Sequence, residues 1–114
     1  MANQTEWTEP TRIRGIIAAI EIEANVTVTP VLPLVRAYDG GAAARDLTLP
    51  IDASLDGYHM TIKNAGETNN LVLKDDAESP ATLLTLAPGD MCECYWSATG
   101  APIALPTYIE PTGG

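Results

Sequence analysis

A strict two-residue alternation of apolar and polar side chains is the feature of this sequence that most constrains its fold. It runs from residue 20 to residue 29, where Ile20, Ile22, Ala24, Val26 and Val28 alternate with Glu21, Glu23, Asn25, Thr27 and Thr29. Successive side chains of a strand point to opposite faces, so this spacing predicts one long strand with an apolar face. An amphipathic helix over residues 16–22 is the competing interpretation, but the density of β-branched residues favours a strand.

Turn residues divide the rest of the chain into short segments with no helical period between them. Pro30 and Pro33 predict an edge or irregular strand, and Asp39-Gly40-Gly41 predicts a turn. Further strands are predicted at residues 47–49, 58–63, 71–74, 83–86 and 91–96, each closed by Gly, Pro, Asn or Asp. Short strands at this spacing predict an all-β domain, which is an antiparallel β-sandwich, a jelly roll or a β-barrel.

The two ends of the chain lack this pattern. The first eleven residues follow neither a strand nor a helix period and have Trp7 as their large apolar anchor, whereas residues 101–114 mix three prolines with apolar side chains. We therefore predict an N-terminal arm at 1–14, a β domain at 15–100 and an extended C-terminal tail at 101–114. Arms of this kind satisfy their backbone by pairing with the sheet edges of neighbours.

Charge and composition exclude several classes of function. The formal net charge of −9 repels phosphate backbones and anionic membranes, so we expect no nucleic-acid and no membrane partner. The most apolar stretch, residues 15–22, is too short to cross a bilayer and contains Glu21, and the first eleven residues lack the basic start of a secretion signal. With no Phe and 5% aromatic residues, an aromatic-lined ligand pocket is not expected.

The residues with the most reactive side chains fit a structural role. Cys92 and Cys94 lie two apart on a predicted strand, so they share a face with Trp96; their nearly parallel Cβ vectors oppose a disulfide, and two buried core thiols are predicted. His59 shares the polar face of its strand with Thr61 and Lys63, and no nucleophile motif accompanies it. We predict no catalytic site, no metal site and no cofactor.

The acidic and glycine-rich motifs have equally plain interpretations. Glu21 and Glu23 are the solvated side of a strand, and Asp75-Asp76 is a turn without the spacing of a calcium loop. Asp39-Gly40-Gly41 lacks the Lys-Ser or Lys-Thr of a phosphate loop. Arg12 and Arg14 are either solvated charges at a strand end or ion-pair partners of an acidic patch on another protein.

The segment 47–96 resembles a module of tailed-bacteriophage virion proteins. Its pieces are Leu47-Thr48-Leu49-Pro50, then Tyr58-His59-Met60-Thr61-Ile62-Lys63-Asn64, then Leu86-Ala87-Pro88-Gly89-Asp90 and the strand 91–96. Such modules occur in head decoration (cement) proteins, head fibres and tail fibres. The chain departs from the pattern at its end, where Trp96 precedes the turn rather than following an Asp-Gly pair.

The resemblance implies a non-enzymatic structural protein on the outer capsid surface of a virion. Its expected partners are the major capsid protein and further copies of itself, as a homotrimer. We predict capsid contact by Trp7, Ile13 and Arg14 and subunit contact by Ile103, Leu105, Tyr108 and Ile109. The alternative is a receptor- or glycan-binding fibre module, which requires exposed aromatic side chains such as Tyr95 and Tyr108.

Overall fold

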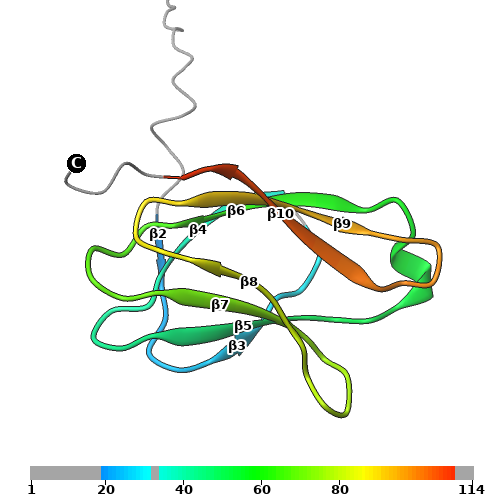
Figure 1. Cartoon of the computed structure of the whole chain (residues 1–114), viewed down its shortest axis with the longest axis horizontal. Helices are drawn as coiled ribbons and strands as arrows, with labels where there is room; N and C mark the ends of the chain where they lie inside the picture. The colour runs from blue at the N-terminus through cyan, green and yellow to red at the C-terminus, as the bar shows by residue number, and fades with distance from the viewer. Residues whose placement is uncertain (1–18, 32–33, 110–114) are drawn as a thin grey trace, which may run out of the picture.

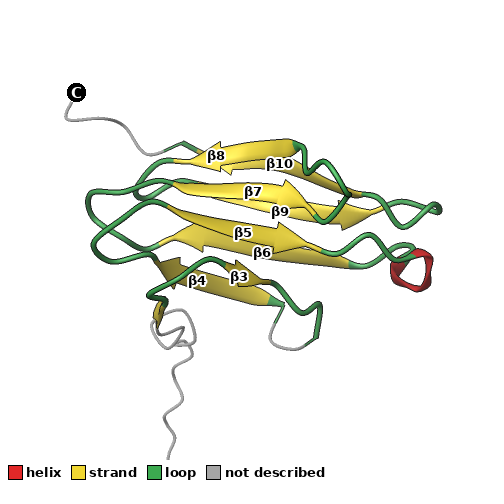
Figure 2. Ribbon diagram, turned by 90° about the horizontal axis from the view of Figure 1, so that it is seen from below, coloured by secondary structure: helices red, strands yellow, loops and turns green. Residues whose placement is uncertain are grey.

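Two β-sheets lie face to face in the computed structural model, which describes residues 19–31 and 34–109 (Figures 1 and 2). The five-stranded sheet has the order β10 (Pro102–Tyr108), β9 (Met91–Trp96), β6 (His59–Asn64), β4 (Val35–Asp39), β2 (Ala19–Glu21). The four-stranded sheet has the order β3 (Val26–Thr27), β5 (Arg45–Leu49), β7 (Leu71–Asp75), β8 (Thr82–Leu86). One short 3₁₀ helix, η3, spans Ala53–Leu55.

The chain reaches this arrangement by changing sheets at each step from β2 to β7. Neighbours within one sheet are therefore parallel along this path: β2 with β4, β4 with β6, β3 with β5 and β5 with β7. Parallel neighbours need a crossover connection, which is usually a helix. Here the crossover is a strand of the opposite sheet, so the chain winds as a flattened coil. The strands β8, β9 and β10 then add antiparallel pairs.

The prediction of an all-β, sandwich-like domain is confirmed, but the prediction of purely antiparallel sheets is wrong. Four of the seven strand pairings among the described residues are parallel, which excludes an antiparallel jelly roll. The two sheets also remain separate rather than closing into a barrel. Alternation reports which side of a strand is buried and carries no information on the direction of its neighbour.

The single long strand predicted over residues 20–29 is also wrong. The chain leaves the five-stranded sheet after Glu21, bends, and enters the four-stranded sheet at Val26. Ile22 donates its N–H to Asp39 at 2.9 Å and is buried, as is Val28 further on. Alternation persists through the corner because Ile22 and Val28 both face the space between the sheets.

Part of the predicted C-terminal tail belongs to the domain. Residues 102–108 form β10, which pairs antiparallel with β9 and makes one edge of the five-stranded sheet. The predicted arm at 1–14, and with it Trp7, Ile13 and Arg14, lies outside the described residues, as does the segment 110–114. Within the described part of the chain, no helix is long and apolar enough to span a membrane.

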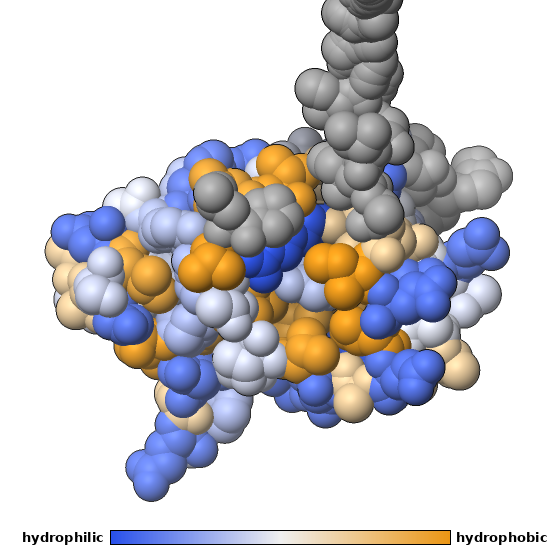
Figure 3. Space-filling model, turned by 180° about the vertical axis from the view of Figure 1, so that it is seen from behind, coloured by the Kyte–Doolittle hydropathy of each residue, from blue (hydrophilic) through white to orange (hydrophobic). Residues whose placement is uncertain are grey.

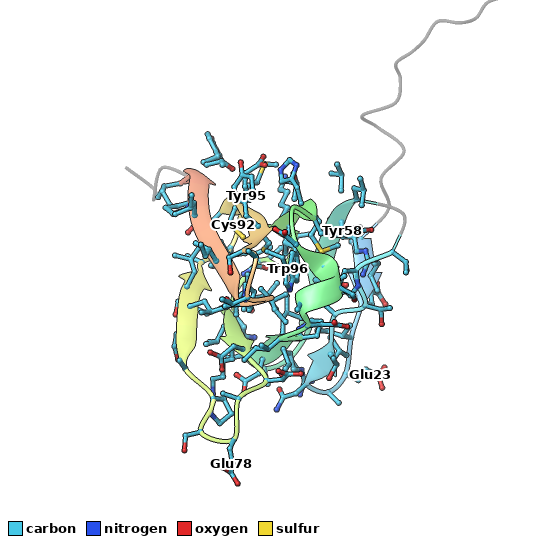
Figure 4. All side chains as sticks on the ribbon, turned by 90° about the vertical axis from the view of Figure 1, so that its right-hand side faces the viewer. Glu23, Tyr58, Glu78, Cys92, Tyr95 and Trp96 are labelled. Atoms are coloured by element: carbon cyan, nitrogen blue, oxygen red, sulfur yellow. The ribbon has the colours of Figure 1, made fainter. Side chains whose placement is uncertain are left out.

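The core lies between the two sheets and is built mainly from aliphatic side chains, as the composition requires. Its fully buried members include Leu47, Leu49, Met60, Ile62, Leu71, Leu73, Leu86, Cys92 and Cys94. Trp96 also points inward; its Nε1 donates to the Pro50 carbonyl at 2.8 Å, and its ring meets Tyr58 edge-on. Figure 4 shows Trp96 between the sheets and Tyr95 on the outer side, so the predicted faces of this strand are confirmed.

Candidate interaction surface

The outward sides of the two sheets differ in chemistry. On the four-stranded sheet the outward side chains include Thr48, Thr85, Asp46 and Lys74, and the last two form an ion pair at 3.2 Å. Such a surface is well solvated and offers little apolar area to a partner. The candidate interaction surface therefore lies on the other sheet.

The outward side chains of β6, β9 and β10 form a surface that we call the outer face. Its members are His59, Thr61, Lys63, Met91, Glu93, Tyr95, Ile103, Leu105 and Tyr108. Ile103 lies opposite Tyr95, and Leu105 lies opposite Glu93. Ile103 is 47% exposed, Leu105 50% and Tyr95 40%, so three large apolar side chains lie next to one another in water. Grouped exposure of this kind is typical of an interaction surface.

The structure therefore brings together three of the four residues predicted for subunit contact. Ile103 and Leu105 belong to the outer face, and so does Tyr108, which lies opposite Met91 after a register shift; Ile109 follows the end of β10. All four are exposed. The sequence prediction did not place Tyr95 beside Ile103, because that contact depends on the pairing of β9 with β10.

A polar network lies beside these apolar side chains on the outer face. His59 Nε2 contacts the Oε1 of Glu93, and the imidazole stacks on Tyr95 with ring centroids 4.7 Å apart. Thr61 donates its hydroxyl to the Oε2 of Glu93 at 3.3 Å. The hydrogen bond from His59, followed by smaller contributions that include those from Thr61 and Tyr95, holds the pKa of Glu93 below its ordinary value.

This network positions side chains rather than activating one. A histidine beside a carboxylate is part of many hydrolase sites, but there the imidazole also contacts a nucleophilic hydroxyl. Here the neighbouring hydroxyl, that of Thr61, donates to the carboxylate of Glu93. The prediction that His59 shares an exposed face with Thr61 and Lys63 is confirmed.

A hollow of about 360 Å³ adjoins the outer face at its β4 side. It exists because Ala19 and Ala37 place only methyl groups between the larger side chains of Val35, Lys63 and Met91. No pattern in the sequence alone predicts this hollow. The two alanines, Ala19 and Ala37, are visible in the sequence, but they become neighbours only through the parallel pairing of β2 with β4.

A second hollow, of about 510 Å³, has an acidic lining. Glu21, Glu23 and Asp39 surround it, together with Arg45, whose Nε donates to the Gly40 carbonyl at 3.0 Å. Among residues 19–31 and 34–109, no group of three or more His, Cys, Asp or Glu side chains is arranged to hold a metal ion. The carboxylates around this hollow therefore form an acidic patch on the surface, without the grouping that a metal site needs.

The remaining acidic pair, Asp75 and Asp76, organises a turn as predicted. Asp75 accepts hydrogen bonds from the backbone N–H groups of Ala77 and Ala81, and Asp76 accepts one from Ile51. Side chains that accept backbone bonds two residues on are typical of turns.

The two cysteines are free thiols buried in the core, as predicted. Their sulfur atoms lie 3.9 Å apart, beyond bonding distance. The hydrogen bond to Cys92, together with burial, raises the pKa of the Cys94 thiol. Burial keeps both sulfurs away from reagents in the native state.

The two edges of the five-stranded sheet differ in their capacity to accept another strand. Trp96 donates its N–H to the carbonyl of Tyr58, so its backbone groups point away from β10. Pro102 is paired with Trp96 across the two strands, and its backbone groups therefore point away from β9, toward the free edge of the sheet. By alternation, Pro102, Ala104 and Pro106 face the free edge. Two of these three positions lack an N–H, so the edge of β10 is poor at strand addition.

The edge of β2 retains its hydrogen-bonding groups. Because Ile22 donates to Asp39, the alternate residues Ala19 and Glu21 turn their N–H and C=O groups away from β4. Figure 3 looks at this side of the molecule and shows apolar side chains gathered among hydrophilic ones. The exposed apolar residues of this region include Ile20, Val31 and Leu34.

No family model, no curated protein and no solved structure matches this chain.

Proposed function

We propose that this chain is a non-enzymatic virion structural protein, a decoration or cement protein that binds the outer surface of a bacteriophage capsid. The observation that carries the proposal is the outer face, where Tyr95, Ile103 and Leu105 are exposed together while the opposite sheet presents polar side chains. A surface of this kind suits a protein that acts by contacting other proteins. The resemblance of segment 47–96 to phage virion modules is the reason for proposing a capsid as the binding partner.

The pieces that carry this resemblance correspond to elements of the fold. Leu47-Thr48-Leu49 belongs to β5, the Tyr58–Asn64 stretch to β6, and Pro88-Gly89 forms the turn between β8 and β9. The resembling segment thus comprises the central strands of both sheets. The resemblance of this segment is the reason for proposing that the β-sandwich belongs to a virion.

In the proposed mechanism, two regions of the chain have separate tasks. The N-terminal arm, with Trp7, Ile13 and Arg14, contacts the major capsid protein. It precedes β2, whose free edge accepts an extended strand from the shell. The outer face and the C-terminal strand join copies into a homotrimer. A ligand that binds only the intact shell stabilises it, because disruption must also break those contacts.

Capsid binding is the test of this proposal. Purified full-length protein is mixed with capsids of the host phage that lack it, and binding is measured by co-sedimentation and by the temperature at which the capsids release DNA. We expect saturable binding and a higher release temperature. A variant that lacks residues 2–11 is expected to bind weakly. Absence of binding by the full-length protein contradicts the proposal.

The second candidate is a receptor- or glycan-binding fibre module. The observation in its favour is the exposed ring of Tyr95, which lies beside the polar groups of His59 and Glu93. Aromatic rings next to hydrogen-bonding groups are typical of sugar sites. Binding on a glycan array that is lost in Tyr95→Ala, together with no capsid binding, favours this candidate over the first.

A further inference from the structure

The structure distinguishes between two ways in which a β-sandwich joins its own copies. Copies either extend a sheet by pairing edge strands or press the faces of their sheets together. The C-terminal edge strand, β10, is exposed and apolar, so it is a contact region in either mode. The backbone groups at its edge disfavour edge pairing, and the side chains on its face favour packing of the faces.

The backbone of β10 argues against edge pairing. Among Pro102, Ala104 and Pro106, which alternation turns to the free edge before the register shift, only Ala104 has an N–H to donate. An incoming strand would leave carbonyl groups of its own without partners, and a buried carbonyl without a hydrogen-bond donor is unfavourable. Proline at an edge is a known device against strand addition.

The side chains of the outer face suit contact with an identical surface. The whole chain has a formal charge of −9, so two copies repel one another in most orientations. The outward residues of β6, β9 and β10 carry one lysine, Lys63, and one glutamate, Glu93, and no other formal charge with His59 neutral. This surface therefore has no net charge. Two copies can meet through this surface without the charge repulsion that acts between the other parts of their surfaces.

The rigidity of the polar network makes the same surface ready for contact. His59 is held by its stacking on Tyr95 and by Glu93, and Glu93 is held in turn by Thr61. Side chains that are already ordered lose little rotamer freedom on association. Tyr95, Ile103 and Leu105 lie beside this network and supply the apolar contact area.

We propose that the outer face of β6, β9 and β10 is the interface with a second copy of this chain, and that the copies pack through this face rather than by pairing the edges of β10. The inference rests on the self-association in the proposed function and is independent of capsid binding. Tyr95, Ile103 and Leu105 form the apolar centre of the interface. His59, Glu93 and Lys63 border it.

The test compares three single-residue variants of the full-length protein. Leu105→Glu puts a charge at the centre of the outer face, and Thr85→Glu makes the same charge change on an exposed residue of the opposite sheet. Pro106→Ala restores a backbone donor to the β10 edge. Oligomer mass and dissociation constant are measured by sedimentation velocity over a dilution series, and circular dichroism verifies that each variant is folded.

We expect wild type to be an oligomer. Leu105→Glu is expected to raise its dissociation constant about tenfold or more, as loss of a central apolar contact does. Thr85→Glu and Pro106→Ala are expected to leave it within about twofold of wild type.

A monomeric wild type overturns the inference. So does tighter association of Pro106→Ala together with an unchanged Leu105→Glu, because that result indicates edge pairing. Tyr95→Glu replaces Leu105→Glu if the latter does not fold. Capsid binding by a monomeric protein would refute this inference and the homotrimer, and it would leave the capsid-binding part of the proposed function intact.

Discussion

The turn between β9 and β10 depends on Gly100, and replacing this glycine by alanine is the most demanding test of the fold. Gly100 has a φ of +85°, donates to Ser97 at 2.8 Å and accepts from the N–H of Asp52 at 3.1 Å. A Cβ at this position would lie 2.2 Å from the carbonyl carbon of Asp52 and 2.3 Å from the nitrogen of Ala53. These are backbone atoms, so no side-chain rotation relieves the overlap.

The magnitude follows from three effects that act together. A left-handed conformation costs a residue with a Cβ about 1–2 kcal/mol. Overlap in a packed region costs about 1–3 kcal/mol, and loss of the Asp52–Gly100 hydrogen bond costs about 0.5–1.5 kcal/mol. We therefore expect Gly100→Ala to lower the free energy of unfolding by about 3–6 kcal/mol, a large part of the 5–15 kcal/mol of a typical domain.

Gly57→Ala is the matched control. Gly57 has a similar φ of +81°, but a Cβ there meets nothing within 4 Å. Gly57→Ala is therefore expected to lower the free energy of unfolding only by the cost of the left-handed conformation, about 1–2 kcal/mol. Urea unfolding followed by circular dichroism measures both variants. Equal destabilisation of the two refutes the argument, because it means that the segment at Asp52 moves away at no cost.

Three further predictions concern buried polar groups and pH. Asn64 is fully buried and donates to the carbonyls of Asn69 and Leu86, so Asn64→Ala is expected to cost about 2–4 kcal/mol in urea unfolding. Cys92 and Cys94 are buried thiols, so a thiol reagent at about pH 8 is expected to react with neither in the native protein and with both after unfolding. The lowered pKa of Glu93 means that its contribution to stability is complete above its ordinary pKa of 4.5 and is lost as the pH falls through the lower folded value. Glu93→Gln is therefore expected to flatten the loss of stability with acid, measured by thermal unfolding across that range.

Each of these predictions has a result that contradicts it. A stable Asn64→Ala variant would show that the two carbonyls find other partners. Rapid labelling of either thiol in the native protein contradicts its burial in the core. An acid profile of Glu93→Gln that coincides with wild type means that the contact with His59 contributes nothing to stability.

Much of the candidate surface was predictable at the level of single strands. The faces of β9 and β6 followed from alternation, because the side-chain period of a strand is local and needs no knowledge of its neighbours. This is why Cys92 and Trp96 were assigned to the core and His59 to the exposed side. The exposure of Ile103 and Leu105 was also expected, although within a tail and not within a strand.

The sequence by itself determined that the chain is all-β, where most strands lie and which of their sides are buried. Only the tertiary structure decided that the corner at Ile22 takes the chain from one sheet to the other and that most neighbours along that path are parallel. It also placed Tyr95 beside Ile103 and turned Pro102 and Pro106 to the free edge. Strand pairing joins segments far apart in the chain, and its register depends on which apolar faces fill the space between the sheets together.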